Sequence, residues 1–348
     1  MAEKKSKKGG VVFLIVVIVV ALAVLALGIL RGFGVIKIPS ISASAFSQRT
    51  RRDNPSSGLS FGKFNLGKFS GSTKYVANLY ITGVIEEANE SYNQEWLLDT
   101  IDELENDQNN VGIMLVIDSP GGSVYEADEV YLALRKYKNS GKQLWAYFKS
   151  IAASGGYYIA CAADSIYANR NTMTGSIGVI IGPTFDATAL LEKIGVKATS
   201  FVSGKNKGML NFNEPLTDEQ KDIVQALVDE CYEQFTDIVA SARNKSIKEV
   251  KALADGRIYT AKQAKENGLI DFIGTLENAE DRMKERLAIV MSLSSDEADQ
   301  IEFYDYDYVY DPPLMRRFFD SIAGDSLRKA LENSFGPAIR YPAYLYRQ

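Results

Sequence analysis

Apolar and polar positions recur along the chain with two different periods. Apolar runs typical of strands occur at residues 75–81, 111–117, 143–148, 165–168, 177–181 and 198–202. Apolar residues at helical spacing predict helices over residues 92–105, 124–137, 155–163, 187–194, 217–239, 247–254, 261–267 and 276–287. Because strands and helices alternate in the first part, the pattern predicts an α/β fold of parallel βαβ units with right-handed crossovers. The last four helices form a helical C-terminal portion.

Residues 11–30 carry no charge and no strongly polar side chain. As a helix this run is about 30 Å long, which matches the thickness of a bilayer core. Four lysines precede the run, so the positive-inside rule predicts a cytoplasmic N-terminus and an extracytoplasmic remainder. A cleaved signal peptide is the alternative, although its apolar core would normally be shorter. We therefore predict a single-pass anchor in the cytoplasmic membrane.

Changes in composition divide the chain into five segments. These are a basic N-terminus (1–10), the anchor (11–30), a linker rich in Ser, Gly and Arg (31–73), a folded domain (74–291) and an acidic tail (292–348). In the tail, tyrosines alternate with other residues between Tyr304 and Tyr310. This two-residue alternation predicts a strand that adds to the edge of a sheet, and the sheet could belong to a neighbouring subunit. A disordered acidic tail is the alternative.

Composition excludes several kinds of site. The net charge is −5 with no basic block beyond the extreme N-terminus, which argues against a nucleic-acid partner. The chain contains no histidine, so a Ser-His-Asp triad is excluded and a zinc site is disfavoured. Cys161 and Cys231 lie in apolar helical runs, which favours two buried free thiols. We expect neither a cofactor nor a metal ion.

Two turns carry the candidate chemistry. Ser154 lies where the strand over 143–148 leads into a helix, a position that favours negative charge but also suits a simple N-cap. Upstream, Pro120, Gly121 and Gly122 follow the buried strand over 111–117. Such a turn can present backbone N–H groups to a carbonyl oxygen that gains charge, although ordinary tight turns look the same. Both turns fall at the carboxyl ends of parallel strands, where α/β proteins place their sites.

A serine nucleophile needs a base, and without histidine the candidates are Lys, Asp and Glu. An ordinary lysine has a pKa of about 10.4, so a lysine base must be desolvated enough to lower that value by roughly three units. The loop Ser203–Gly208 contains two candidates, Lys205 and Lys207. For either residue, an exposed loop lysine is the simpler interpretation.

The motifs, in their order along the chain, resemble the bacterial signal peptide peptidase A family in its short form. The resemblance covers about residues 74–290 and is carried by Asp118–Gly122, Ala152–Ile159, Thr174–Val179, Gly256–Thr260, Gln263–Ala264 and Gly268–Asp271. It implies a Clp/crotonase-like fold, a parallel-sheet ββα superhelix with a helical C-terminal portion. It also implies a Ser–Lys peptidase that degrades signal peptides left in the membrane after secretion.

The resemblance assigns roles to individual residues. Ser154 matches the nucleophile, and Lys207 matches the base through its Ser-Gly-x-x-Lys context. The residue after Lys207 is Gly208, where the family commonly has an acidic residue, so Lys205 stays an alternative. Ser176 matches a hydroxyl that orients the base, and a serine at the start of a strand is the simpler interpretation.

The oxyanion hole is expected from two backbone N–H groups, those of Gly121 and Gly155, with Gly122 as a substitute. The expected substrates are signal peptides and other extended hydrophobic peptides. Members of the family form rings in which the serine and the lysine of one site come from neighbouring subunits, so a homo-oligomeric ring is expected here.

Two other functions fit parts of the pattern. A crotonase-like acyl-CoA enzyme would share the fold but would leave Ser154 and Lys207 without a role, and binding of CoA thioesters would identify it. A non-catalytic membrane scaffold would use the ring and the tyrosine-rich tail. Labelling by a serine-directed probe that disappears in Ser154→Ala would exclude the scaffold.

Overall fold

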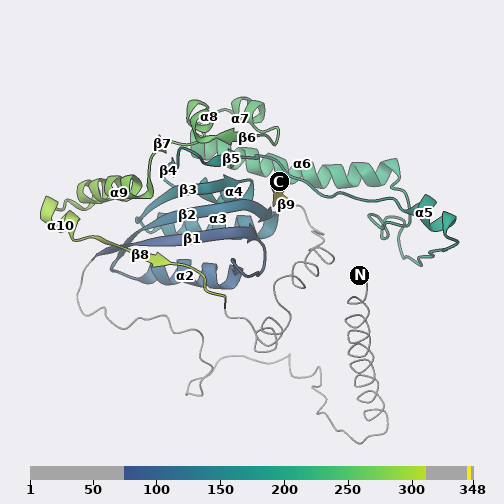
Figure 1. The fold of residues 1–348 in the computed structure, drawn as a ribbon, viewed down its shortest axis with the longest axis horizontal. Coiled ribbons are helices and arrows are strands. Elements are labelled where there is room, and N and C mark those ends of the chain that lie inside the picture. The colour runs from purple at the N-terminus through teal and green to yellow at the C-terminus, as the bar shows by residue number, and fades with distance from the viewer. Residues whose placement is uncertain (1–73, 311–342, 346–348) are drawn as a thin grey trace, which may run out of the picture. The chain divides into compact units, whose positions relative to one another are not determined.

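Three long parallel strands form the centre of the protein in the computed structural model, which describes residues 74–310 and 343–345 (Figure 1). They are β1 (Tyr75–Ile85), β2 (Asn110–Ser123) and β3 (Gln143–Ala153), and β2 pairs with both neighbours in parallel. Helix α2 (Gln94–Asn106) connects β1 to β2, and α3 (Val124–Asn139) connects β2 to β3. The predicted parallel βαβ units are therefore confirmed.

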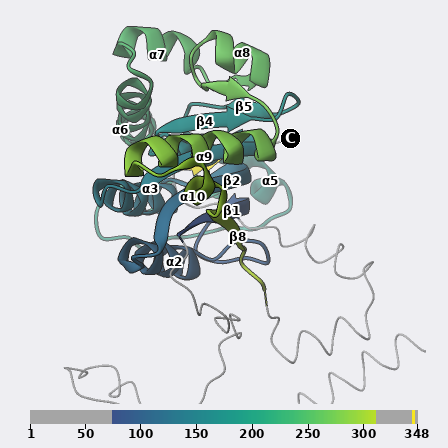
Figure 2. The same cartoon turned by 90° about the vertical axis from the view of Figure 1, so that its left-hand side faces the viewer.

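Each face of this sheet packs against helices. On one face Leu79, Ile113 and Leu144 are fully buried in the larger core cluster with side chains of α2 and α3. On the other face Val76 and Met114 are fully buried in a second cluster with side chains of α9 (Leu276–Met291). Figure 2 shows α9 in front of the sheet. Burial on both faces explains the almost continuous apolar runs of the central strands.

Shorter elements complete the sheet and its helical surroundings. Strands β4 and β5 pair in parallel with β3, β7 pairs in parallel with β4, and β6 pairs antiparallel with β5. Their bounds, with those of the remaining helices, are β4 (Ser165–Ala168), β5 (Met173–Gly175), β6 (Ile258–Thr260), β7 (Phe272–Ile273), α4 (Gly155–Ala160), α5 (Thr188–Lys193), α6 (Asp218–Arg243), α7 (Ile247–Leu253), α8 (Ala261–Glu266) and α10 (Ser295–Asp299). Helix α6 begins with a capping box, in which the Thr217 side chain accepts from the Gln220 N–H.

Two predicted strands are wrong. The run over 177–181 forms no named strand, because β5 ends at Gly175 and the next residue, Ser176, adopts a positive φ of 49° that turns the chain away from β3. The run over 198–202 is irregular, and its Phe201 is 96% exposed. This stretch contains Thr199 and Ser200 between its apolar residues, and among the described residues no strand lies beside it.

The alternating tyrosine segment does form a strand. Strand β8 (Glu302–Tyr306) pairs in parallel with β1, so the edge that it extends belongs to its own chain. The ring of Tyr304 contacts that of Tyr75 edge-on, with centroids 5.4 Å apart. The strand interpretation of this part of the tail is confirmed, while the disordered alternative is wrong for residues 302–306.

The predicted membrane anchor lies outside the described residues, as do the basic N-terminus and the linker. Among the residues that are described, no helix combines the length and the apolar character that a membrane crossing requires.

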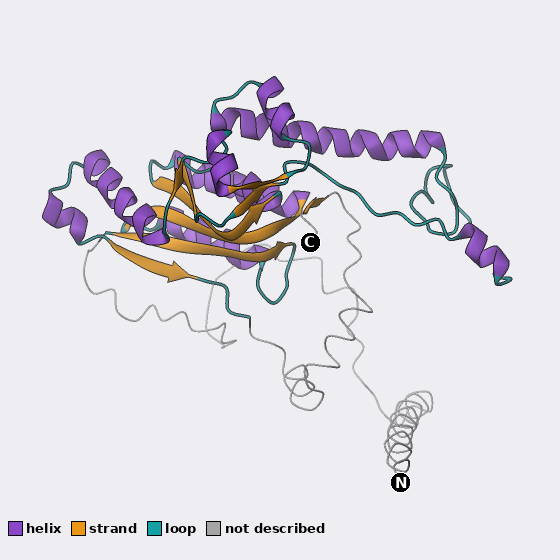
Figure 3. Ribbon diagram, turned by 45° about the horizontal axis from the view of Figure 1, so that its top comes forward, coloured by secondary structure: helices purple, strands orange, loops and turns teal. Residues whose placement is uncertain are grey.

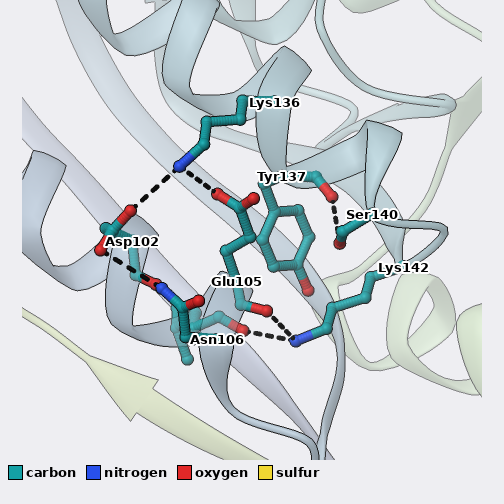
Figure 4. A network of polar contacts seen from close by, with 8 residues as sticks. Asp102, Glu105, Asn106, Lys136, Tyr137, Ser140 and Lys142 are labelled. Atoms are coloured by element: carbon teal, nitrogen blue, oxygen red, sulfur yellow. Dashed lines mark hydrogen bonds and ion pairs between the residues drawn. The ribbon is translucent and has the colours of Figure 1, made fainter.

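A half-buried lysine closes the C-terminus of α2. The Lys142 ammonium donates to three backbone carbonyls, those of Leu104 at 2.6 Å, Glu105 at 2.9 Å and Asp107 at 2.7 Å. These are carbonyls that a helix end leaves without an intrahelical partner, so a cation there also complements the helix dipole (Figure 4). On the surface nearby, Lys136 forms ion pairs with Asp102 and Glu105 and is 63% exposed.

Lys142→Met is expected to lower the free energy of unfolding by about 2 kcal/mol, because three carbonyls lose a charged donor. Thermal and urea unfolding of the two proteins would measure the change. Lys136→Met is the matched control and should alter stability little, since exposed ion pairs contribute little. Equal effects of the two substitutions would contradict the role assigned to Lys142.

Candidate active site

Ser154 lies in a strained turn between β3 and α4. Its φ of 55° falls in the left-handed region, where non-glycine residues are uncommon. Its N–H donates to the Gly175 carbonyl at 2.8 Å, and its own carbonyl accepts from the Tyr158 N–H at 2.9 Å. These two hydrogen bonds hold the backbone of Ser154 in place. Strain that the surroundings maintain is typical of functional sites.

The hydroxyl of Ser154 is buried and free. The residue is 1% exposed, and its Oγ has no hydrogen-bond partner among the described residues. The side chain does not cap α4, so the simple N-cap interpretation is wrong. Leaving a buried hydroxyl unpaired costs free energy, and a group that binds the oxygen only during a reaction would explain that cost.

The predicted turn at residues 120–122 is wrong in form, because β2 continues as a strand through Ser123, with a register shift opposite Thr82–Val84 and a positive φ of 101° at Gly121. We keep the name glycine turn for Gly121 and Gly122 in this irregular strand end, which touches the start of α4. A Cβ added to Gly155 would lie 3.2 Å from the Gly122 nitrogen and 3.4 Å from the Gly121 Cα. The structure therefore brings together the two segments predicted to form the oxyanion hole. It also shows that the Gly121 N–H donates to the Ser119 Oγ at 3.1 Å. That bond engages the Gly121 N–H, which leaves Gly122 as the alternative donor beside Gly155. Gly122 itself pairs with Ile85 of β1 and with Tyr344 of β9 (Ala343–Leu345).

Ser176 lies next to this turn. The residue before it, Gly175, accepts the hydrogen bond from the Ser154 N–H, and the Ser176 N–H donates to the Arg257 carbonyl at 2.8 Å. Ser176 is buried and lines a cavity of about 380 Å³ together with Val179, Tyr232 and Asp255. The hydrogen-bonded ion pair with Arg257 lowers the pKa of the exposed Asp255 carboxyl to about 2.

The two candidate lysines lie in the segment between α5 and α6. Lys205 forms an ion pair with Glu219 at 2.7 Å, which lowers the pKa of the Glu219 carboxyl. Lys207 is exposed, and its ammonium has no hydrogen bond or ion pair with any described residue. The geometry thus leaves Lys207 available for a contact outside its own chain. No hydrogen bond within the described residues joins either lysine to Ser154.

That segment projects from the rest of the structure. We call residues 183–217 the arm; it contains α5 and leads into α6, and Figures 1 and 3 show it beyond the ends of the strands. None of residues 183–217 is buried. Its exposed apolar side chains include Phe185, Leu190, Ile194, Phe201 and Phe212. An apolar surface of this extent is typical of a protein interface.

Sequence reasoning missed one element of the site. Strand β9 (Ala343–Leu345) pairs antiparallel with Gly121–Ser123, so a segment of the chain lies extended along the glycine turn. No pattern around residues 343–345 indicates this pairing. The role of the Ser119 hydroxyl was missed as well, although its position two residues before Gly121 is the spacing of a side-chain-to-backbone turn.

The described residues contain no group of three or more Cys, Asp or Glu side chains that could hold a metal ion.

Comparison with protein families and relatives agrees with the motifs. The model of peptidase family S49 matches residues 136–290. A Synechocystis protein provisionally named protease slr0021 is 37% identical over 264 residues, which are 76% of this chain and 88% of that protein. A protein of Enterococcus faecium provisionally named signal peptide peptidase SppA is 39% identical, and the match spans 61% of this chain and 64% of that protein.

Two more distant similarities were found. Protease 4 of Haemophilus influenzae is 35% identical over 50% of this chain and 28% of its own length. Among solved structures, a single-residue mutant of ClpP1 from Listeria monocytogenes aligns with a TM-score of 0.38 and 19% identity over 58% of this chain and 92% of the ClpP1 chain.

Proposed function

The chain belongs to peptidase family S49 and is a serine protease, and from this premise we propose that it is a membrane-anchored endopeptidase with a Ser154–Lys207 dyad. The observation that carries the proposal is the buried, unpartnered Ser154 hydroxyl in a strained turn beside Gly122 and Gly155. We assign the Clp/crotonase-like superhelix to this sheet and remnant signal peptides to the substrate. Membership of a peptidase family supports a hydrolase. No observation favours the alternative of a crotonase-like acyl-CoA enzyme.

The reaction uses the residues in the following roles. The neutral Lys207 amine takes the proton of the Ser154 hydroxyl, and the oxygen attacks the carbonyl carbon of a peptide bond. The backbone N–H groups of Gly122 and Gly155 stabilise the negative oxygen of the tetrahedral intermediate. Lys207 returns the proton to the leaving amine, and then activates the water that hydrolyses the acyl-enzyme. Ser176 orients the lysine.

Peptides bind in an extended form in this proposal. The pairing of β9 with Gly121–Ser123 shows that the glycine turn accepts an antiparallel strand. A substrate in that position would receive backbone hydrogen bonds that do not depend on its side chains. Selectivity would then come from apolar side-chain pockets, which suits hydrophobic leader peptides.

Lys207 is proposed to act on the Ser154 of a neighbouring copy. Among the described residues the lysine lies on the exposed arm and has no partner, while the serine hydroxyl lacks a base. Docking the arm on a neighbour would bury its apolar side chains and remove water from the amine. Both changes would favour the neutral amine that the mechanism requires. A closed ring satisfies every such head-to-tail contact.

Mixing two inactive variants tests this arrangement. Ser154→Ala and Lys207→Ala are each expected to be inactive. When equal amounts are assembled together, activity should return in about a quarter of the sites, because random assembly provides an intact serine and an intact lysine in that fraction of them. Cleavage of a quenched fluorescent peptide measures the recovery. The control pairs Ser154→Ala with the double variant Ser154→Ala/Lys207→Ala and should stay silent. Silence of the first mixture, with mixed assembly shown by differential tags, would place both groups in one chain.

We further propose that residues 11–30 anchor the protein in the cytoplasmic membrane with the catalytic domain outside. The basis is the uncharged run and the lysines before it. Trypsin added to intact protoplasts is expected to digest a C-terminally tagged protein, and deletion of residues 11–30 should move the tag to the soluble fraction. If the tag is protected until the protoplasts are lysed, the catalytic domain lies on the cytoplasmic side, opposite to the proposed orientation.

A further inference from the structure

A cavity of about 540 Å³ opens on the face of the sheet that carries α9. Its floor is a row across three strands, because Tyr80 of β1 pairs with Val116 of β2, and Val116 pairs with Tyr147 of β3. Leu276, the first residue of α9, adds an apolar wall. The cavity is within the size range of small-ligand sites, and its floor suits aliphatic or aromatic side chains.

The rim of this cavity supplies hydrogen-bond donors and one positive charge. Lys149 follows Tyr147 by two residues on the same strand, so both side chains leave the same face. Its Nζ lies 5.8 Å from the centre of the Tyr80 ring, and it forms no ion pair within the described residues. Asn169 and Asn171 line the rim, and their side-chain NH₂ groups have no acceptor among the described residues. No carboxylate is among the described lining residues, but the Ser150 hydroxyl donates to the Asp118 carboxylate and the Tyr80 hydroxyl donates to the Asp305 carboxylate at 3.3 Å. The rim donors that no described residue engages are therefore Lys149 and the two asparagines.

We infer that this cavity binds the C-terminal end of an apolar peptide, with the carboxylate on Lys149. A cation beside amide donors and an apolar floor fits a carboxylate attached to a hydrophobic side chain. A fatty acid also carries a carboxylate, but it has no backbone amides to pair with Asn169 and Asn171 on the rim. The polar rim therefore favours the peptide.

Such ends are products of peptide hydrolysis. When water cleaves a peptide bond, the C–N bond breaks, the water oxygen stays on the carbonyl carbon as a new carboxylate, and the amine takes a proton. The lining residues include neither Ser154 nor the glycine turn, so the cavity is separate from the catalytic groups. The inference that the cavity binds a peptide end rests on the geometry of the cavity alone. The inference that this peptide is a product of the protein's own cleavage rests on the proposed function.

Calorimetry with the full-length Ser154→Ala protein in detergent tests the site without turnover. The probe is the acetylated tripeptide Ala-Leu-Phe, with either a free carboxylate or a C-terminal amide. The carboxylate form is expected to bind about tenfold more tightly than the amide form, because the amide lacks the charge-assisted hydrogen bond to Lys149. Lys149→Gln should remove this difference, whereas Lys262→Gln, an exposed lysine on α8, should preserve it.

Several results would overturn the inference. Equal affinity for the acid and the amide, or a difference that persists in Lys149→Gln, would show that Lys149 does not bind the carboxylate. Loss of binding when a serine-directed phosphonate blocks wild-type Ser154 would place the peptide in the catalytic groove. Tighter binding of octanoate than of the tripeptide would make the cavity a lipid site. None of these outcomes depends on whether Lys207 is the base, which the mixing experiment decides.

Discussion

Ser154→Ala is expected to lower kcat/KM for cleavage of a model signal peptide by about 10⁴-fold or more, because it removes the atom that attacks the carbonyl. The folded protein should not be weakened. Its hydroxyl has no hydrogen-bond partner among the described residues, so alanine gives up no contact and removes an unpaired buried oxygen. Initial rates and thermal unfolding, measured on the same preparations, would check both parts.

Ser140→Ala serves as the matched control. The Ser140 hydroxyl donates to the Tyr137 carbonyl at the end of α3 and takes no part in the catalytic turn, so its loss should leave the rate unchanged. Cleavage by Ser154→Ala at a rate near that of the wild type would rule out a serine nucleophile at this position. If Ser154→Ala instead unfolds at a temperature well below that of the wild type, Ser154 has a structural role.

The α/β architecture was predictable because each central strand is buried on both faces. The run over 111–117 contains no charged residue, and all of it is buried between the two layers of helices. The strand predicted over 198–202 is wrong: its sequence Ala-Thr-Ser-Phe-Val is not a continuous apolar run, and Phe201 is 96% exposed. A short stretch with only a few apolar side chains does not specify a buried strand.

The position of Ser154 was predictable for a different reason. A serine between a strand and a helix is a local feature that one stretch of sequence specifies, whereas the Pro-Gly-Gly segment, predicted as a turn, continues β2 as a strand through Ser123. The engagement of the Gly121 N–H by the Ser119 hydroxyl is also local, because the two residues are two positions apart. What is not local is the pairing of Gly121 and Gly122 with β1 on one side and β9 on the other. The strand β9 is farther still from Gly121 along the chain, so only the folded structure reveals their pairing.

The choice between the lysines follows from their partners. Lys205 is held by Glu219 in an ion pair within its own chain. Lys207 has no such partner among the described residues. The Lys207 side chain is therefore the one that the proposed docking of the arm could bring to a neighbouring Ser154 without breaking an ion pair.

Lys207→Ala is accordingly expected to lower kcat by about 10³-fold or more, whereas Lys205→Ala should stay within a few fold of the wild type. Lys207→Arg should be as inactive as the alanine variant, because a guanidinium keeps its proton and cannot act as a base. Steady-state rates at saturating peptide, with assembly checked by size-exclusion chromatography, separate lost chemistry from lost oligomers. An inactive Lys205→Ala beside a fully active Lys207→Ala would transfer the role of base to Lys205, and Glu219→Gln would then be expected to raise the rate by freeing that amine.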